Sequence, residues 1–158
     1  MKTSEALDMQ GRLTLQLCDA AGRVIQRQTA PNHIVLSGRD LVARMFVLGD
    51  LKPISHLAVG KGTQAVAASD TKLVAEVARV PIKPLQLDRD LLEISTEDGK
   101  DKRKKVVIHA ELGYAQGNET LTEAALFNQN GIMYNRIVFA PVQKTQDFVL
   151  TLIWEITF

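Results

Sequence analysis

The last eleven residues restrict the fold of this chain more than any other segment. Residues 148–158 place an apolar side chain at every second position, from Phe148 through Trp154 to Phe158. Successive side chains of a β-strand point to opposite faces of a sheet, so this pattern makes one strand face apolar over its whole length. The sequence therefore predicts a core strand here, and apolar residues from elsewhere in the chain must oppose it.

Two more strands are expected directly before this one. Residues 119–128 and 132–140 are separated by Gln129, Asn130 and Gly131, and Asn-Gly is a strong hairpin signal because both residues tolerate positive φ. Residues 141–147 then connect to the C-terminal strand, and their length favours another hairpin. We therefore expect three consecutive antiparallel strands at the C-terminal end.

Two further hairpins are expected earlier in the chain. Residues 11–18 alternate, and the turn from Asp19 to Gly22 has the residue order that type I turns favour, so residues 23–29 are predicted to return as a second strand. Residues 91–96 and 104–112 are predicted to pair in the same way, joined by a long charged connection.

One segment reads as an edge strand. Residues 79–87 are predicted to be extended, but Pro81 and Pro84 cannot donate ladder hydrogen bonds. Prolines within strands are confined to sheet edges, so this strand is expected at an edge.

Two segments have helical character. Ser37 is a candidate N-cap for a helix over residues 38–48, because Leu41, Met45 and Leu48 recur at helical spacing. Ser69 is a candidate cap for a second helix of about two turns, which only tertiary contacts would sustain. We expect one helix of about three turns and one short helix.

About eight or nine strands exceed what a single one-faced sheet needs, so either two sheets packed face to face or a closed barrel is expected, and the sandwich is favoured. The predicted fold is mainly β: an antiparallel β-sandwich of the jelly-roll or immunoglobulin-like kind. With 158 residues, of which 46% are hydrophobic, the chain fits a single domain over residues 1–158. Residues 1–10 are expected to form an N-terminal arm that can be flexible.

Composition excludes several classes of function. The formal net charge is +1, from 19 basic and 18 acidic residues, so no global field attracts nucleic acid or an anionic membrane. Residues 1–10 lack a secretory signal, and no apolar run is long enough to insert into a membrane. The single cysteine, Cys18, permits no internal disulfide, which suits assembly in a reducing cytoplasm.

Residues 60–63, Gly-Lys-Gly-Thr, invite comparison with a phosphate-binding loop. Such a loop needs a glycine five residues before its Gly-Lys pair, and Ser55 occupies that position here. The favoured interpretation is a tight glycine turn with the Lys61 side chain in solvent.

The chain has one basic cluster, which is the candidate partner-contact site. Its members are Lys100, Lys102, Arg103, Lys104 and Lys105. Neighbouring acidic residues offset much of its charge and no aromatic residues interleave, so nucleic-acid binding is not favoured. A solvated hairpin tip is the first interpretation, and ordering against an acidic partner subunit is the second.

Glu123 and Arg136 are the other charged residues of interest, because each lies in an otherwise apolar segment. The first interpretation is a cross-strand ion pair on the outer face of a sheet, and the second is a contact between subunits. The three histidines have no metal-ligand spacing, and neither Cys18 nor Ser37 has the context of a nucleophile. No catalytic residue, metal or cofactor is therefore expected.

Several segments together resemble small structural proteins of tailed bacteriophages and phage-like particles. The resemblance rests on residues 54–63, 69–73 and 76–79, and on the 37–44 segment, Glu123-Ala-Ala-Leu-Phe127 followed by Gly131, and the C-terminal 152–158 segment, which occur in the same order along the chain. It spans roughly residues 33–158. Lys61 departs from the small or hydroxyl residue expected between the two glycines.

The resemblance implies assembly rather than catalysis. It suggests a non-enzymatic virion protein that forms homo-oligomers and docks onto the tail, neck, collar, baseplate or a tail fibre, after assembly in the host bacterial cytoplasm. A capsid decoration protein, or a carbohydrate- or receptor-binding module at a tail tip, stays open as an alternative. Exposed aromatic residues for sugar stacking are scarce, since Trp154 is expected in the core.

Overall fold

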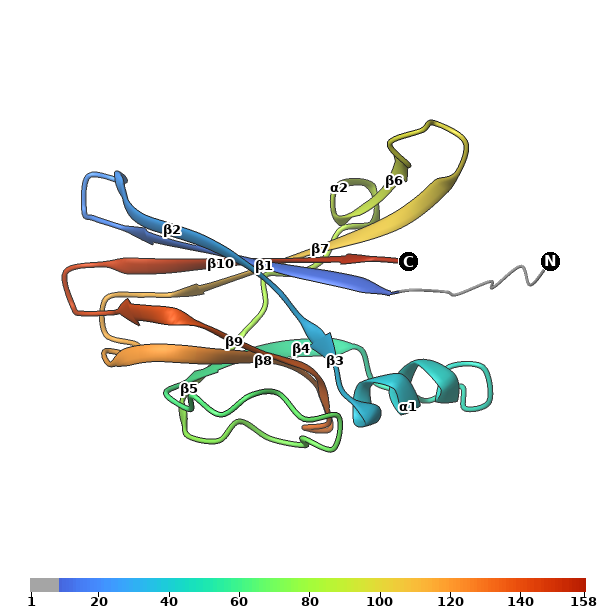
Figure 1. The fold of residues 1–158 in the computed structure, drawn as a ribbon, viewed down its shortest axis with the longest axis horizontal. Coiled ribbons are helices and arrows are strands. Elements are labelled where there is room, and N and C mark those ends of the chain that lie inside the picture. The colour runs from blue at the N-terminus through green and yellow to red at the C-terminus, as the bar shows by residue number, and fades with distance from the viewer. Residues whose placement is uncertain (1–8) are drawn as a thin grey trace.

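Ten β-strands and two helices make up most of residues 9–158, the part of the chain that the computed structural model describes (Figure 1). The strands are β1 (Gln10–Cys18), β2 (Val24–Pro31), β3 (His33–Ile34), β4 (Ile54–Gly60), β5 (Glu76–Pro81), β6 (Leu91–Ser95), β7 (Lys102–Leu112), β8 (Thr120–Asn128), β9 (Met133–Gln143) and β10 (Val149–Thr157). The helices are α1 (Leu36–Arg44) and α2 (Leu87–Asp90).

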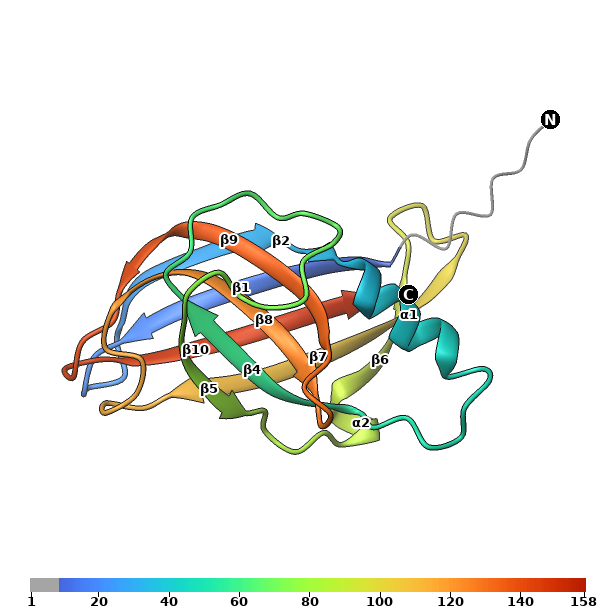
Figure 2. The ribbon, with the colours of Figure 1, turned by 90° about the horizontal axis from the view of Figure 1, so that it is seen from below.

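The strands form two antiparallel sheets of five strands each. Sheet A has the order β2-β1-β10-β7-β6, and sheet B has the order β3-β9-β8-β4-β5. The two sheets pack face to face, as the two ribbon views show (Figure 1, Figure 2). The predicted antiparallel β-sandwich is confirmed.

β10 lies at the centre of sheet A, between β1 and β7. Trp154 pairs with Leu13 of β1 and with Ile108 of β7, and all three side chains are buried between the sheets. The inward residues Leu150, Leu152 and Ile156 are buried as well, whereas the alternate residues of β10 are partly exposed. The prediction of a C-terminal core strand is therefore confirmed.

The hairpins expected from the turn residues form as β1–β2, β6–β7 and β8–β9. In the β8–β9 turn only Gly131 adopts positive φ, at 76°, because no described non-glycine residue does so. The Asn128 side chain accepts hydrogen bonds from the backbone N–H groups of Asn130 and Ile132, which stabilises this turn. The predicted edge position is confirmed, since β5 is an edge strand of sheet B, but this strand covers Glu76–Pro81 rather than residues 79–87.

The predicted hairpin between β9 and β10 is wrong. β9 belongs to sheet B, β10 belongs to sheet A, and the chain crosses from one sheet to the other after Gln143. Both sides of β10 are occupied by β1 and β7 along almost its whole length, so no edge is left for β9. The length of the connection was compatible with a hairpin, but strand pairing was decided by residues far away in the sequence.

The helix predictions need two corrections. α1 covers Leu36–Arg44 rather than 38–48, and Ser37 does not cap it, since its hydroxyl donates to the Met133 carbonyl at 2.6 Å. The predicted helix after Ser69 does not form, because the backbone N–H groups of Val74 and Ala75 donate to the Glu123 carboxylate instead of to helical carbonyls. The second, short helix is α2.

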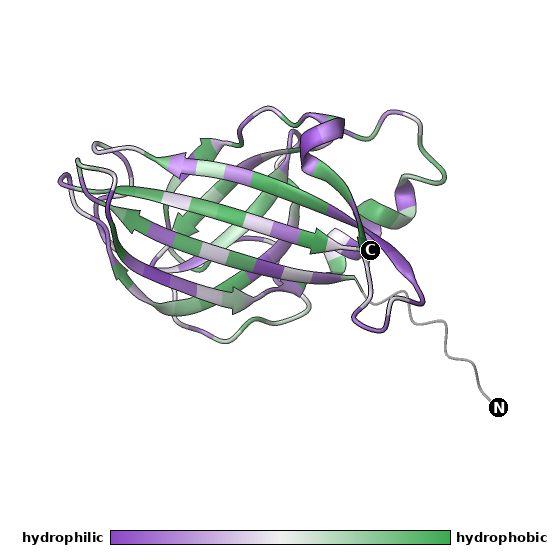
Figure 3. Cartoon of the chain, turned by 90° about the horizontal axis from the view of Figure 1, so that it is seen from above, coloured by the Kyte–Doolittle hydropathy of each residue, from purple (hydrophilic) through white to green (hydrophobic). Residues whose placement is uncertain are grey.

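The outer faces of the two sheets differ. Whereas α1 lies at one end of the sandwich, the connection between β4 and β5, residues 61–75, which we call the covering loop, lies over the outer face of sheet B (Figure 2). A second, smaller apolar cluster is buried there: Val35, Ala58, Leu73, Ala125, Phe127 and Met133. No helix or loop of residues 9–158 covers the outer face of sheet A in this way, and its strands show alternating hydrophilic and hydrophobic residues (Figure 3).

Residue 10 already belongs to β1, so the predicted flexible arm does not extend to it. Met9 is also described, and its sulfur lies 3.9 Å from the Tyr134 hydroxyl, whereas residues 1–8 of the predicted arm lie outside the described residues. Within residues 9–158, no helix has the length and apolar character needed to cross a membrane.

Candidate functional site

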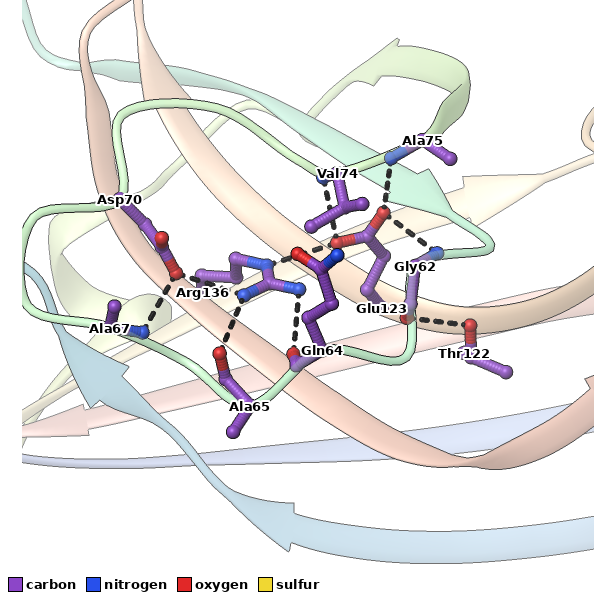
Figure 4. Close-up of polar contacts among 10 residues, drawn as sticks. All are labelled: Gly62, Gln64, Ala65, Ala67, Asp70, Val74, Ala75, Thr122, Glu123 and Arg136. Atoms are coloured by element: carbon purple, nitrogen blue, oxygen red, sulfur yellow. Dashed lines mark hydrogen bonds and ion pairs between the residues drawn. The ribbon is translucent and has the colours of Figure 1, made fainter.

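Glu123 and Arg136 form the ionic pair at the centre of a buried polar network on the outer face of sheet B (Figure 4). Glu123 lies on β8 and Arg136 on β9, where it pairs with Ala125, so the ion pair runs diagonally between the strands. The exposed fraction of Glu123 is 0% and that of Arg136 is 1%, since the covering loop lies over both. The predicted cross-strand pair is confirmed as an intrachain contact, and the alternative of an intersubunit contact is wrong.

The Glu123 carboxylate accepts three backbone hydrogen bonds from the two ends of the covering loop. Oε1 accepts from the N–H groups of Gly62 at 2.9 Å and Ala75 at 2.8 Å, and Oε2 accepts from Val74 at 3.1 Å. Oε2 also accepts from Nε of Arg136 at 3.0 Å. All the strong acceptor positions face a donor, which allows a carboxylate to be buried.

The Arg136 guanidinium binds the middle of the same loop. Nη2 donates to the Gln64 carbonyl at 3.0 Å, and Nη1 donates to the Asp70 carboxylate at 2.9 Å (Figure 4). Asp70 in turn accepts from the Ala67 backbone N–H at 2.9 Å. The two side chains together therefore fix both ends and the middle of a loop that has no helix or strand of its own.

Burial would raise the pKa of the Glu123 carboxyl, but the hydrogen bonds outweigh it. The N–H groups of Ala75 and Val74, the Arg136 side chain and the N–H of Gly62 hold the pKa below its ordinary value. Glu123 is therefore ionised at neutral pH and acts as a permanent anion for the loop.

The glycines of residues 60–63 are explained by this anion. A Cβ atom on Gly62 would lie 2.6 Å from Glu123 Oε1, and one on Gly60 would lie equally close to the same atom. The Gly62 N–H that a phosphate would need already binds Glu123, which supports rejecting the phosphate-loop interpretation. The Lys61 side chain is half exposed, as expected for the favoured tight turn, and lies 3.3 Å from Glu119.

The basic cluster lies on and beside the β6–β7 hairpin, at the end of the molecule where that hairpin projects from the sandwich (Figure 1). Lys102 and Lys104 both form ion pairs with Glu93 of β6, at 2.8 and 3.1 Å. Lys105 forms an ion pair with Glu155 of β10 at 2.9 Å. Neither Lys100 nor Arg103 forms an ion pair with a described residue, so these two charges remain available to a partner.

A groove of about 990 Å³ opens on the outer face of sheet A beside this hairpin. The start of β1 and the end of β2 line one side, and Arg103, Lys105 and the acidic hairpin tip line the other. Glu155 lines the groove, and its carboxylate accepts hydrogen bonds from Arg12 and Lys105. Burial would raise the pKa of Glu155, but these two cations lower it. The groove therefore presents fixed charges of both signs.

A third surface feature is the segment that follows α1, Met45-Phe46-Val47-Leu48, which we call the apolar segment. The exposed fraction is 90% for Phe46, 80% for Val47 and 68% for Met45. The helical spacing of Leu41, Met45 and Leu48 predicts a helix that includes all three residues, which is wrong because α1 ends at Arg44. Helical spacing alone could not reveal this.

Lys144 is a buried residue that the sequence analysis missed. Its side chain is fully buried at the crossing between the sheets, where Nζ donates to Asn118 Oδ1 at 2.8 Å and to the Thr145 carbonyl at 2.9 Å. Burial lowers the pKa of this amine. A lone lysine in a polar connecting segment carries no sequence signal for burial.

Other acidic side chains are engaged in contacts within the chain, and the single tryptophan is buried. Among the described residues, no three His, Cys, Asp or Glu side chains are grouped so that they could hold a metal ion. Asp90 is held by Arg89 and by the Gln86 N–H, which lower its pKa to about 2, while Glu93 pairs with lysines. Trp154 is fully buried and cannot stack on a sugar.

In the part of the chain that the structure describes, the strands define an antiparallel β-sandwich of two five-stranded sheets, with the covering loop on the outer face of sheet B. Comparison with protein-family models, with curated proteins and with solved structures finds no match.

Proposed function

We propose that this protein is a non-enzymatic structural subunit of a tailed-phage or phage-like particle, which binds copies of itself and neighbouring proteins of the tail, collar or baseplate. The observation that carries the proposal is the apolar segment after α1. A globular protein gains stability by burying such side chains, at about 25 cal/mol for each Å² removed from water. Four consecutive apolar residues left in solvent are typical of a surface that another protein covers.

Two further features support an assembly role. The β6–β7 hairpin projects beyond the sandwich and carries Lys100 and Arg103, which form no ion pair with any of residues 9–158, so it offers cations to an acidic surface. Two of the buried charged side chains, Glu123 and Arg136, are engaged in holding the covering loop. The particle context comes from the sequence resemblance.

The proposal is tested in two steps. Size-exclusion chromatography with light scattering is expected to give a molar mass that is a multiple of the 17.4 kDa chain. Antibody labelling of purified particles is then expected to mark the tail, collar or baseplate. Label on the capsid would instead identify a decoration protein, and a monomer that is absent from particles would refute the proposal.

The role of the apolar segment is tested by Phe46→Ser combined with Val47→Ser. Loss of incorporation into particles, with unchanged thermal unfolding, is expected because these side chains support binding and not the fold. Val24→Ser is a matched control, because Val24 is an exposed apolar residue of β2 far from α1 in the sequence. Equal incorporation of all variants would exclude the apolar segment as a docking surface.

A further inference from the structure

The sandwich has four sheet edges, and three of them are protected. β2 is tied to sheet B, because the side chains of Gln26 and Gln28 donate to backbone carbonyls of β9. β3 is two residues long and leads into α1. β5 ends at Pro81, which has no N–H, and the following segment bonds to β7 through Lys83. Such devices prevent edge-to-edge pairing of sheets.

β6 is the edge without such protection. It contains no proline, and no described element lies along its outer side. Its one charged residue, Glu93, is neutralised by Lys102 and Lys104 of its own hairpin. Leu91 and Leu92 are both exposed.

The direction of the free backbone groups on β6 follows from its neighbour. Lys104 of β7 exchanges both backbone hydrogen bonds with Phe158, on the side away from β6. Hydrogen-bonded and non-hydrogen-bonded pairs alternate along an antiparallel ladder, so Glu93, which is opposite Lys104, points its N–H and C=O outward. By the same alternation Ser95 points its N–H and C=O outward as well. The Leu91 carbonyl also faces outward, whereas the Leu91 N–H donates to the Leu87 carbonyl of α2.

We propose that β6 pairs with β6 of a second copy of this chain, antiparallel and across a twofold axis, so that two copies of sheet A become one continuous sheet. This inference rests on the self-assembly proposed above and names its surface. One register uses all three outward residues of both copies: Glu93 opposite Glu93, and Leu91 opposite Ser95. It forms about four backbone hydrogen bonds: the Glu93 pair exchanges two, and each Ser95 N–H donates to the Leu91 carbonyl of the other copy, while the Leu91 N–H stays bonded to Leu87.

The side chains of β6 fit a second copy in this register. On the outer face, Leu92 of one copy lies opposite Ile94 of the other, which makes two apolar cross-strand pairs. On the opposite face, the two Glu93 carboxylates are adjacent, and Lys102 and Lys104 of both copies flank them. Four ammonium groups around two carboxylates offset the repulsion between the carboxylates. An isologous contact of this kind is what twofold symmetry requires.

The test compares Ser95→Pro with Ser95→Ala. Proline removes an outward N–H and leaves the ladder to β7 intact, whereas alanine keeps the N–H. Light scattering is expected to give half the wild-type molar mass for Ser95→Pro and the wild-type value for Ser95→Ala. A monomeric wild-type protein would refute self-assembly. If the wild type is an oligomer and Ser95→Pro has the same molar mass, the role of β6 is refuted but self-assembly is not.

A second measurement does not depend on the proline variant folding. Glu93→Cys in a Cys18→Ser background would place two thiols opposite each other at the axis, with Cα atoms about 5.5 Å apart, a separation that suits a disulfide. Mild oxidation is expected to give a covalent dimer on a non-reducing gel. Glu76→Cys on the β5 edge, in the same background, is the control. Equal cross-linking of both variants, or of neither, would overturn the proposal.

Discussion

Glu123 and Arg136 lie on the outer face of a sheet, a position that normally faces water, yet neither side chain reaches solvent. Their burial is possible because the covering loop supplies backbone donors to the carboxylate and backbone acceptors to the guanidinium. The loop has no regular secondary structure, so these two side chains replace the hydrogen bonds that a helix or strand would have given it. At the scale of single residues, this pair holds residues 61–75 in place.

Arg136→Met is expected to destabilise the fold by about 3 to 5 kcal/mol, because it leaves the buried Glu123 carboxylate without its cation. Arg136→Lys is expected to recover part of this loss, since one ammonium cannot bind Glu123, Asp70 and the Gln64 carbonyl together. Urea unfolding measures both values. Similar stability of Arg136→Met and wild type would show that the network does not hold the loop.

The pH dependence of stability provides a separate test of Glu123. Its pKa in the folded protein lies below the ordinary 4.5, so its stabilising contribution is complete above pH 4.5 and is lost as the pH falls through the folded value. The difference in unfolding free energy between wild type and Glu123→Gln should therefore be largest at neutral pH and should shrink below pH 4.5. A difference that is independent of pH would contradict this assignment.

Gly62→Ala tests how closely the loop approaches the carboxylate. The added Cβ would lie 2.6 Å from Glu123 Oε1 and 2.5 Å from Val74 Cβ, so a loss of about 1 to 3 kcal/mol is expected. Gly49→Ala is the matched control, because nothing lies within 4 Å of a Cβ at that position. Thermal unfolding of the two variants gives the comparison, and equal midpoints would refute the expectation.

α1 shows how one element can serve the core at one end and the surface at the other. Leu41 packs into the core between the sheets, and Gly38 lies so close to the Tyr134 backbone that no side chain fits there. After Arg44 the chain leaves the helix and carries the apolar segment into solvent. Apolar residues at one helical spacing are therefore buried at Leu41 and exposed in the apolar segment.

Two alanine substitutions separate these environments. Leu41→Ala is expected to cost about 2 to 5 kcal/mol, since it removes a buried side chain. Phe46→Ala is expected to change stability by less than about 0.5 kcal/mol, because this side chain is 90% exposed. Chemical denaturation of the isolated protein measures both. A large loss for Phe46→Ala in a monomeric sample would show that the apolar segment belongs to the core.

The whole molecule is stabilised by one apolar core that both sheets share. Strands near the two ends of the chain meet in it, since β1 and β10 pair along nine positions. Trp154, the single tryptophan, lies fully buried at its centre. The two sheets therefore cannot separate without exposing this core to water.

We expect a single cooperative unfolding transition on this basis. Trp154 fluorescence should report the core, far-ultraviolet circular dichroism should report the strands, and the two should give the same midpoint. Two separate midpoints would show that one sheet unfolds before the other. In the native protein the Trp154 emission should be blue-shifted, because the indole is out of contact with water.

Much of the secondary structure could be predicted because alternation is a local property. The inward faces of β1 and β10, the turn at Gly22 and the glycine of the β8–β9 turn all follow from residues within a few positions of one another. Local sequence also predicted that the basic cluster lies on a hairpin and that Glu123 and Arg136 lie on adjacent strands. It did not predict the burial of that pair, because residues 61–75, which cover it, are distant in sequence from both β8 and β9.

By itself, then, the sequence determined that this chain forms antiparallel strands with one apolar face each, and therefore two sheets that must cover each other. The tertiary structure alone decided that β10 pairs with β1 and β7 rather than with β9, that residues 61–75 form a loop rather than a helix, and that Glu123 and Arg136 are enclosed. The physical reason is that strand alternation is fixed by the backbone geometry of adjacent residues. The pairing of strands and the burial of charges depend instead on residues far away in the sequence. Among the possible partners, those that satisfy the backbone and side-chain hydrogen bonds at the lowest free energy are the ones found in the fold.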